Sequence, residues 1–416
     1  MAVPLIVVGA GASGLAAASA AGRLGTEVLV LEKKEQPLKK LLLTGNGRCN
    51  FTNLKITPDS YRSHDSAFPE HFLREFGTED ALSFFRELGL YPGFRGDYVY
   101  PMSMQAQSVR DALLSGIRSL PVTVRTGVSV REITKDPKTG LFTVKCAEEE
   151  FRCRKIILSC GTPAGVRDRE AYTADRILRA LGHHVYPLKP ALVKLLGQSG
   201  AETFWDGVRH HCIITLIRES DGRTISEDGE VQFTKDGISG IPVFQLSHAA
   251  GEEIERRKKA SLSLNLIPEL SGREMYNALI RLKNSPYHEA RELRELLTGF
   301  LPKKLVRAVF AQYGELGQKK AAELSEQEIR FVSELLSAFP YEVTGTGDAL
   351  SAQVMRGGAD LSEFTENLES RLVPGLYVTG ELLDIDGKCG GFNLHFAWGS
   401  GIRAGNSAGK DSGASL

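Results

Sequence analysis

The pattern of apolar and polar segments near the start of the chain predicts a strand–helix–strand unit. Residues 4–8 (PLIVV) form a short apolar run that is typical of a buried β-strand. A glycine-rich segment, residues 9–14, separates this run from an alanine-rich helical stretch over residues 15–24. After Gly25, a second apolar strand is predicted over residues 28–31. The whole unit is about thirty residues long, which is typical of a βαβ motif.

The remaining pattern predicts an α/β domain that is split by an insertion. Helical periodicity and strand-like patterns alternate up to residue 159, with helices at 70–88 and 105–119 and strands at 122–133, 141–146 and 155–159. The insertion shows short strands between turns over 191–268, a helical bundle over 271–337 and a strand-like piece over 341–357. An apolar strand at 376–379, a glycine turn and a helix from Asn393 onward then return to the first domain.

Composition and charge restrict the classes of partner. Hydrophobic residues make up 42% of the 416 residues and charged residues 25%, which is usual for a globular protein. Lys plus Arg and Asp plus Glu number 51 each, so a nucleic-acid partner held by an overall positive field is not expected. We expect no membrane association, because the chain contains neither a signal peptide nor a long uninterrupted apolar segment.

The cysteines indicate a reducing compartment and no metal site. The six cysteines form no C-x-x-C pair and lack zinc-ligand spacing with histidine, and they are too sparse for a disulfide-stabilised secreted scaffold. The adjacent pairs His183-His184 and His210-His211 would point to opposite faces of a strand, so a shared metal is not expected there. A cytoplasmic location fits this composition best.

The turn at residues 9–14 has the G-x-G-x-x-G spacing of a dinucleotide-binding site. In that context Gly9 permits a tight turn, Gly11 lets the backbone approach a pyrophosphate, and Gly14 allows close packing of helix and strand. Glu32, at the end of the second strand, is placed to accept hydrogen bonds from ribose hydroxyls and would repel a 2′-phosphate. We therefore predict a Rossmann-type domain that binds FAD or NAD; the alternative is a structural glycine turn.

Two further segments favour FAD. Residues 40–53 (KLLLTGNGRCNFTN) form a second glycine loop, which a long flavin cofactor needs and a simple NAD dehydrogenase does not. In residues 380–394 (GELLDIDGKCGGFNL), Glu381 is placed to accept from a ribityl hydroxyl. The pair Gly390-Gly391 leads into a helix whose N-terminus would face the flavin N1–C2=O edge. A surface loop and a plain strand–turn–helix are the alternatives for these segments.

Together with the stretches VVGAGASGLAAA (7–18), FTKDGISGIP (233–242) and GLYVTGE (375–381), these segments resemble the bacterial BaiN/YhiN-type NAD(P)/FAD-dependent oxidoreductases. The resemblance runs from about residue 3 to residue 406. It implies a glutathione-reductase-like FAD domain interrupted by an inserted β-barrel domain and a small helical domain. We accordingly assign 1–190 and 358–416 to the FAD-binding domain, 191–270 to the barrel, 271–337 to the helical domain and 338–357 to return strands of the barrel.

The resemblance also implies a set of cofactor contacts. These are Gly9, Gly11, Ala12, Ser13, Gly14, Glu32, Lys33, Lys40, Thr44, Arg48, Cys49, Asn50, Val130, Gly380, Glu381, Gly391, Phe392, Asn393 and Leu394. After the strand at 155–159 the chain departs from the Gly-rich pattern of the family, so only Cys160 and Gly161 are assigned there. His395 stands where glutamine is common, and Lys388 and Cys389 are unusual at their positions.

Three residues are candidates for chemistry, each with a structural alternative. Cys49 is either a reactive thiol or packing beside the cofactor, and His395 is either a proton donor or a hydrogen-bonded structural histidine. Arg48 would hold the cofactor or an anionic substrate rather than serve as a surface charge. Four aromatic residues, Tyr91, Phe94, Tyr98 and Tyr100, form either a substrate wall or an ordinary core cluster.

These features predict an FAD-dependent oxidoreductase that transfers hydride from NAD(P)H to a small-molecule substrate. The chain has no second G-x-G-x-x-G, so NAD(P)H would bind transiently rather than in its own domain. One alternative is an oxidase or dehydrogenase of an amine or a similar small molecule. The other is an FAD-dependent RNA-modifying enzyme, for which a basic face would be expected.

Overall fold

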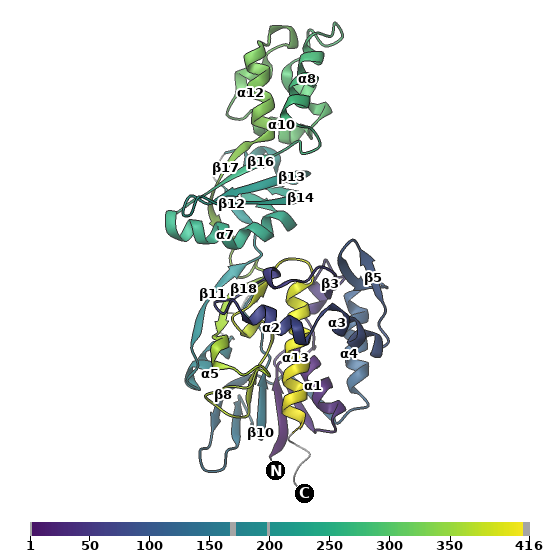
Figure 1. The fold of residues 1–416 in the computed structure, drawn as a ribbon, viewed down its shortest axis with the longest axis vertical. Coiled ribbons are helices and arrows are strands. Elements are labelled where there is room, and N and C mark those ends of the chain that lie inside the picture. Colours follow the sequence, from purple (N-terminus) through teal and green to yellow (C-terminus); the bar gives the residue numbers. More distant parts are fainter. Residues whose placement is uncertain (1, 167–171, 198–199, 411–416) are drawn as a thin grey trace. The chain divides into compact units, whose positions relative to one another are not determined.

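The computed structural model describes residues 2–166, 172–197 and 200–410, and the chain divides into two compact units (Figure 1). Unit 1 comprises residues 1–189 and 354–416, and unit 2 comprises residues 190–353. Figure 1 shows that unit 1 combines the purple and blue elements of the N-terminal half with the yellow elements of the C-terminus. The predicted α/β fold with an inserted β-barrel is confirmed.

Unit 1 is built on a seven-stranded sheet, within the described residues, in which β10 pairs with β1, β9 and β19. The strand order is β7-β2-β1-β10-β9-β8, and β19 also pairs with β10. The strands β7, β2, β1, β10 and β19 run parallel, whereas β8, β9 and β10 form an antiparallel meander. The strands are β1 (Val3–Val8), β2 (Val28–Glu32), β7 (Val122–Thr126), β8 (Val130–Lys135), β9 (Phe142–Cys146), β10 (Glu150–Leu158) and β19 (Leu376–Val378). The parallel strands end at one edge, where polar loops can meet.

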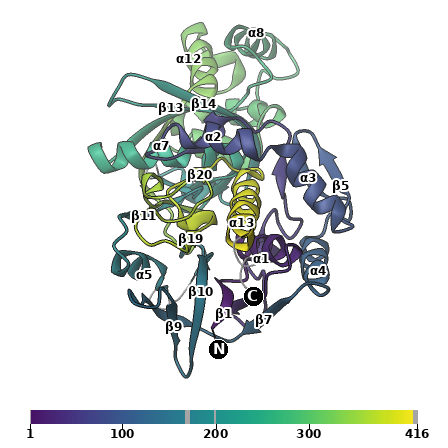
Figure 2. The same ribbon diagram turned by 60° about the horizontal axis from the view of Figure 1, so that its bottom comes forward.

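The first and the last helix of unit 1, α1 (Ala12–Arg23) and α13 (Phe392–Lys410), pack closely against each other (Figures 1 and 2). A Cβ at Gly401 would lie 2.2 Å from the Ser13 carbonyl oxygen, and one at Gly405 would lie 2.3 Å from that of Ala17. Only glycine fits at these points, because the opposing atoms belong to the backbone of α1. The remaining helices of unit 1 are α2 (Phe68–Glu75), α3 (Thr78–Glu87), α4 (Ala106–Ile117) and α5 (Ala174–Ala180).

Three small sheets complete unit 1 and hold the loops beside the main sheet. They pair β3 (Thr52–Asn53), β6 (Tyr98–Pro101) and β5 (Pro92–Arg95); β4 (Tyr61–Arg62) and β20 (Asp386–Gly387); and β11 (Val185–Ala191) and β18 (Val354–Ala359). The strand β18 begins within the segment 338–357 that the sequence assigned to the barrel, but it pairs with β11 instead, so that part of the assignment was wrong. Only β17 (Phe339–Thr346) of that segment joins the barrel.

Unit 2 contains a closed six-stranded barrel and a group of helices that share one hydrophobic core. The barrel order is β12 (Leu195–Gly197), β15 (Gly237–Ser239), β14 (Thr224–Thr234), β13 (Arg209–Ile217), β16 (Ala260–Asn265) and β17. The helices after it are α8 (Gly272–Lys283), α9 (Leu293–Leu296), α10 (Lys303–Val309), α11 (Gly314–Gln318) and α12 (Glu326–Ser337). Trp205, in the short helix α6 (Glu202–Trp205), is fully buried in this core.

The expectation of short strands separated by turns over residues 191–268 was wrong over part of that range, because a long helix, α7 (Ile241–Arg257), lies between two barrel strands. Gly240 precedes it with φ +110°, Pro242 stands in its first turn, and Lys258 ends it in a left-handed conformation. Val243, Leu246 and Ala250 form its buried face with helical spacing. Among the helices of the described residues, none combines the length and apolar composition that a membrane span requires.

Candidate functional site

In the glycine turn between β1 and α1, one glycine has free space where a side chain would begin, and the other two do not. A Cβ at Gly9, where φ is +104°, would lie 2.5 Å from the Ser159 carbonyl oxygen, and one at Gly14 would lie 1.9 Å from that of Gly9. At Gly11, the N-cap of α1, an added Cβ would meet nothing within 4 Å. The two closed glycines shape the turn, while Gly11 leaves space in front of the first N–H groups of α1. Those groups have no intrahelical partner and attract anions.

Glu32 at the end of β2 is anchored beside this turn. Its Oε2 accepts a hydrogen bond from the Ala10 N–H at 2.7 Å, and its Oε1 accepts one from the Lys34 N–H at 2.8 Å. Each carboxylate oxygen has further acceptor capacity, so the ribose contact predicted from the sequence remains chemically available. Lys33 is half-buried, and the backbone N–H of Val128 bonds the Glu32 carbonyl at 2.9 Å, which brings the start of β8 and Val130 toward Glu32.

The second glycine loop is a tight turn with left-handed residues at four positions. Gly45, Asn46, Gly47 and Cys49 all have φ between +54° and +77°. The Cys49 N–H donates to the Thr44 carbonyl at 3.0 Å, which closes the turn. From Phe51 onward the segment is buried, and β3 pairs with β6. The turn itself, residues 45–48, is exposed, and the buried residues 49–53 that follow fix it to the domain.

The C-terminal turn packs directly against this loop. A Cβ at Gly391 (φ +97°) would lie 2.5 Å from the Thr52 carbonyl oxygen and 2.8 Å from Asn50 Oδ1. The Asn53 amide donates to the Gly390 carbonyl at 2.9 Å. The close approach explains why two glycines stand at this point, since a side chain would separate the two segments.

Asn393 holds the turn that precedes α13. Its amide nitrogen donates to the carbonyl of Gly387 at 2.9 Å, and its amide oxygen accepts from the N–H of the same residue at 2.8 Å. Phe392 is buried, and its carbonyl accepts a bond from the Tyr61 hydroxyl at 3.0 Å, while Leu394 is half-buried. The side chain of Asn393 is thus occupied by the protein, which leaves the N–H groups at the start of α13 for a ligand.

Glu381 connects its own C-terminal segment to the second glycine loop and to the segment after β10. Its Oε2 pairs with Lys40 Nζ at 2.8 Å and accepts from the Thr162 hydroxyl at 3.0 Å. Gly380, with φ +66°, lies so close to α1 that a Cβ would be 2.7 Å from Ser13 Oγ. The sequence analysis did not single out Thr162, although it follows directly after the assigned Cys160 and Gly161.

Asn50 provides a sign that the site takes a ligand. The side chain is buried, and its Oδ1 has no hydrogen-bond partner among the described residues. A buried amide oxygen without a donor costs free energy, about 1–3 kcal/mol, unless a ligand or water supplies one. Of the other assigned positions, Gly161 has open space at its Cβ position and φ +65°, and Arg48 and Lys40 are exposed.

Two of the candidates for chemistry are structural residues. His395 is fully buried, its Nδ1 lies 2.9 Å from Thr52 Oγ1, and its Nε2 lies 3.2 Å from the Phe76 carbonyl oxygen. Burial lowers the pKa of His395 to about 4, which favours the neutral ring and the structural alternative. Burial raises the pKa of the Cys49 thiol to about 12, and that of Cys160 likewise, which disfavours the thiolate at both positions.

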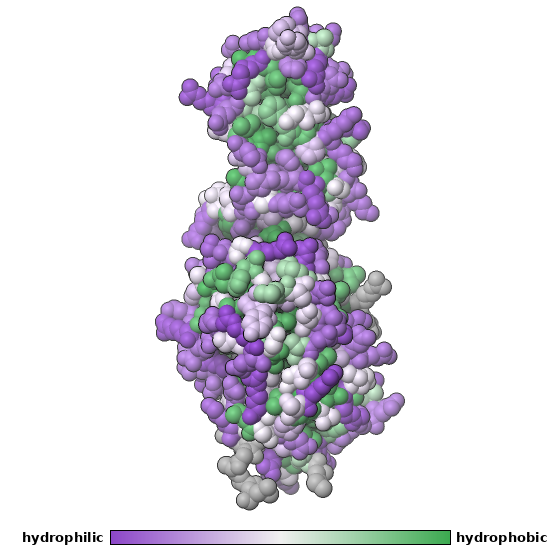
Figure 3. Space-filling model, turned by 90° about the vertical axis from the view of Figure 1, so that its right-hand side faces the viewer, coloured by the Kyte–Doolittle hydropathy of each residue, from purple (hydrophilic) through white to green (hydrophobic). Residues whose placement is uncertain are grey.

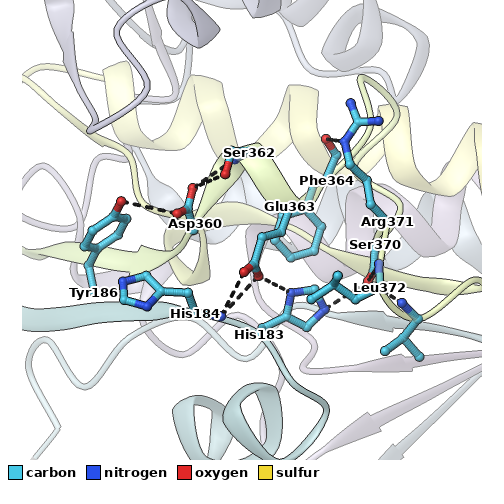
Figure 4. Close-up of polar contacts among 11 residues, drawn as sticks. His183, His184, Tyr186, Asp360, Ser362, Glu363, Phe364, Ser370, Arg371 and Leu372 are labelled. Carbon is cyan, nitrogen blue, oxygen red and sulfur yellow. Dashed lines mark hydrogen bonds and ion pairs between the residues drawn. The ribbon is translucent and has the colours of Figure 1, made fainter.

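A second polar cluster in unit 1 connects a carboxylate, a histidine and a serine in the order of a catalytic triad, but it is not accessible to a substrate (Figure 4). His183 Nδ1 lies 2.7 Å from Glu363 Oε2, and His183 Nε2 lies 2.9 Å from Ser370 Oγ. The His183 side chain is fully buried, and Ser370 Oγ also accepts from the N–H groups of Leu372 (3.1 Å) and Val373 (2.8 Å). The cluster therefore ties β11 to the segment after β18 and has no room for a substrate. Within the described ranges, no group of three or more His, Cys, Asp or Glu residues is arranged to hold a metal ion.

The fold and the geometry of these loops define a Rossmann-type flavoprotein in which the N- and C-terminal parts of the chain form one site. Residues 3–407 match the model of the HI0933-like protein Rossmann domain. The chain belongs to this HI0933-like family, as the resemblance to BaiN/YhiN-type proteins predicted, and it is an FAD-dependent oxidoreductase.

Relatives of the chain act on two different kinds of molecule. It is 35% identical over 408 residues to the 3-dehydro-bile acid delta(4,6)-reductase of Clostridium scindens, covering 97% of this chain and 98% of that one. It is 28% identical over 410 residues to the ribosomal RNA dihydrouridine synthase of Escherichia coli, covering 95% of each. Among solved structures, the 3-ketosteroid delta1-dehydrogenase of Sterolibacterium denitrificans has a TM-score of 0.52 at 15% identity, with 97% and 99% of the chains covered. That likeness shows a shared fold.

Proposed function

We propose that this protein is an FAD-dependent reductase of carbon–carbon double bonds conjugated to a carbonyl group, with NAD(P)H as the electron donor. The observation that carries this proposal is the similarity, over nearly the whole of both chains, to a reductase of a 3-dehydro-bile acid. The uracil C5=C6 bond, which becomes saturated in dihydrouridine, is also conjugated to a carbonyl. Both relatives are therefore named for substrates with the same reactive unit.

The residues of the site fit FAD. The open space at Gly11 and the N-terminus of α1 suit the pyrophosphate, and Glu32 suits the adenosine ribose. The unpartnered Asn50 Oδ1 beside Gly391 suits a ring N–H donor, and the start of α13 suits a group that gains negative charge on reduction. Bound FAD would supply a two-electron carrier between a nicotinamide and the substrate.

We further propose that the substrate is a small molecule in a cytoplasmic setting. The net charge of zero lacks the positive excess that tight RNA binding by an overall field would need, and all six cysteines are free thiols. NAD(P)H would bind transiently over the flavin, since the sequence holds one G-x-G-x-x-G motif. A second candidate is reduction of a uridine in RNA, which the ribosomal RNA dihydrouridine synthases favour.

The test is an anaerobic experiment in two steps. The purified holoprotein is first titrated with NADH and NADPH separately, and bleaching of the flavin bands by one of them is expected. The reduced protein is then mixed with a 3-oxo-Δ4,6 bile acid or with a uridine-containing ribosomal RNA fragment. Reoxidation by the bile acid supports the small-molecule proposal, and reoxidation by the RNA alone supports the second candidate. A flavin that neither nicotinamide reduces, but that an amine does, would replace both with an amine dehydrogenase.

A further inference from the structure

Two tyrosines of β6 face the two glycine turns of the candidate site. Along this strand Val99 and Pro101 are buried, whereas Tyr98 and Tyr100 alternate with them and are half-buried. A Cβ at Gly390 would lie 2.6 Å from Tyr98 Cε1, and one at Gly45 would lie 3.5 Å from Tyr100 Cε1. The tyrosine face of β6 therefore borders both the loop around Thr44 and the turn before α13.

The surroundings of the Tyr100 hydroxyl are positively charged. Partial burial raises the pKa of this phenol, and the guanidinium groups of Arg48 and Arg95 act in the opposite direction, while the Cys389 thiol raises it further. Arg95 lies on β5 opposite Tyr98, so the hairpin itself brings this charge to the tyrosine face. Both arginines are exposed.

The hairpin also carries apolar side chains that are exposed to solvent. Phe94 of β5 and Met102, just after β6, have 53% and 68% of their surface accessible. Figure 3 views the side of the molecule that lies on the right in Figure 1, where β5 is labelled, and it shows green apolar side chains among purple hydrophilic ones. Phe94 pairs with the buried Val99 and so lies on the opposite face from the tyrosines, whereas Arg95, opposite Tyr98, lies on the tyrosine face of β6.

We propose that Tyr100 is the proton donor of the reduction, with Arg48 and Arg95 as positioning residues that stabilise its phenolate. This inference rests on the proposed function. In the reduction of a conjugated C=C bond, the β-carbon would accept a hydride, which bound FAD reduced by NAD(P)H would supply, and the π-electron pair would move to the α-carbon. The Tyr100 O–H bond then breaks, its proton forms the new C–H bond at the α-carbon, and solvent reprotonates the phenolate.

Among the other titratable residues discussed for this site, three kinds are unsuited to donate a proton, which leaves the phenols of β6; of these, Tyr100 is the one beside the glycine loop that carries Arg48. Cys49 is a buried thiol, Cys160 is half-buried with its thiol directed to the Val8 carbonyl at 3.6 Å, and His395 is buried with both ring nitrogens engaged. Glu381 is already held by Lys40 and Thr162. A phenol is protonated at neutral pH; burial raises the pKa of Tyr100 above its ordinary value, and the charges of Arg48 and Arg95 offset part of that rise, which lowers the cost of giving up the proton.

The kinetic test separates the two half-reactions by stopped flow. Tyr100→Phe keeps the ring and removes the proton. It should leave flavin reduction by NAD(P)H unchanged and slow reoxidation by the 3-oxo-Δ4,6 bile acid by about 10²-fold or more, as for loss of a general acid. Tyr287→Phe is the matched control, since Tyr287 lies in unit 2 with 87% of its surface exposed. A slowing of tenfold or more supports the proposal, and a smaller one overturns it.

A second readout needs neither flavin nor substrate. In the apoprotein labelled with [¹³Cζ]tyrosine, NMR titration gives the pKa of Tyr100, assigned by its loss in Tyr100→Phe. Arg48→Met and Arg95→Met should each raise that pKa, and an unchanged value in both variants overturns the role of the arginines and of Tyr100 as an activated acid. If wild-type holoprotein is reoxidised by neither the bile acid nor the RNA fragment, the proposed function fails and the role of Tyr100 fails with it; if the wild type is reoxidised and Tyr100→Phe is slowed less than tenfold, only the role of Tyr100 fails.

Discussion

The packing of α13 on α1 predicts that Gly405→Ala destabilises unit 1. The added methyl group would lie 2.3 Å from the Ala17 carbonyl oxygen and 2.9 Å from the Ala17 Cα. An ordinary contact needs about 3.5–4.0 Å, so the two helices would have to separate by roughly 1 Å. Because the opposing atoms are backbone, no side-chain rotation relieves the clash.

Two opposing effects determine how much Gly405→Ala lowers the free energy of unfolding. Overpacking a dense interior costs about 1–3 kcal/mol, and a backbone contact belongs in the upper half of that range. Replacing glycine by alanine in a helix returns about 1 kcal/mol through helix propensity. We therefore expect Gly405→Ala to lower the free energy of unfolding of unit 1 by about 1–2 kcal/mol.

The two tryptophans allow each unit to be measured by itself. Trp398 is fully buried in unit 1 and Trp205 in unit 2, so urea unfolding followed by fluorescence in the Trp205→Phe background reports on unit 1. Gly272→Ala is the control, because its Cβ would meet only Ser337 Oγ, at the ordinary distance of 3.7 Å. Followed through Trp205 in the Trp398→Phe background, it should leave unit 2 as stable as before or stabilise it by up to about 1 kcal/mol. A Gly405→Ala protein as stable as its parent would show that the helices do not approach as closely as described.

Three other predictions concern the candidate site. Glu32→Gln removes the charge from the hydrogen bond to Ala10 and should weaken FAD binding at least about tenfold, measured by quenching of flavin fluorescence, whereas exposed Glu35→Gln should not. Cys49 should resist iodoacetamide at pH 8 in the native protein and react after unfolding, as mass spectrometry would detect, because burial raises the pKa of its thiol to about 12. The pKa of His395 is about 4 in the folded state and near 6.5 when unfolded, so unit 1 should lose stability as the pH falls from 6.5 to 4, by about 1.4 kcal/mol per pH unit. His395→Gln should abolish that slope in urea unfolding.

The local sequence was sufficient to predict the elements on which the site is built. The segments of β1, α1 and β2 carry an unbroken pattern of apolar strand, glycine turn and alanine-rich helix, and no tertiary contact overrides it. The helix α7 was missed because its apolar residues occur beside Pro242 and two glycines, a composition that is also typical of turns between strands. The pairing of β18 with β11 depends on a partner more than 150 residues away, which no local pattern contains.

Helical geometry alone could have predicted from the sequence that His395 does not point to the same side of the helix as Asn393. It follows Asn393 by two positions, and successive residues on a helix differ by about 100° in direction, so the two side chains point to nearly opposite sides. The structure accordingly turns His395 into the core against Thr52 and Phe76, while Asn393 holds the turn at Gly387. Closeness in sequence to a cofactor turn is therefore a weak guide to contact once the segment is helical.

Packing requires the glycines of α13 as strictly as those of the phosphate-binding turn, but this requirement is harder to predict from the sequence. Gly401, Gly405 and Gly409 recur every four residues and so form one stripe along the helix, which lies against the backbone of α1. In an isolated sequence such glycines look like weak helix formers, since their requirement arises only from the second helix. The stripe affects the site, because it fixes the position of α13 along the axis of α1. The start of α13 and the turn before it, including Gly391, are thereby placed by helix packing, before any cofactor binds.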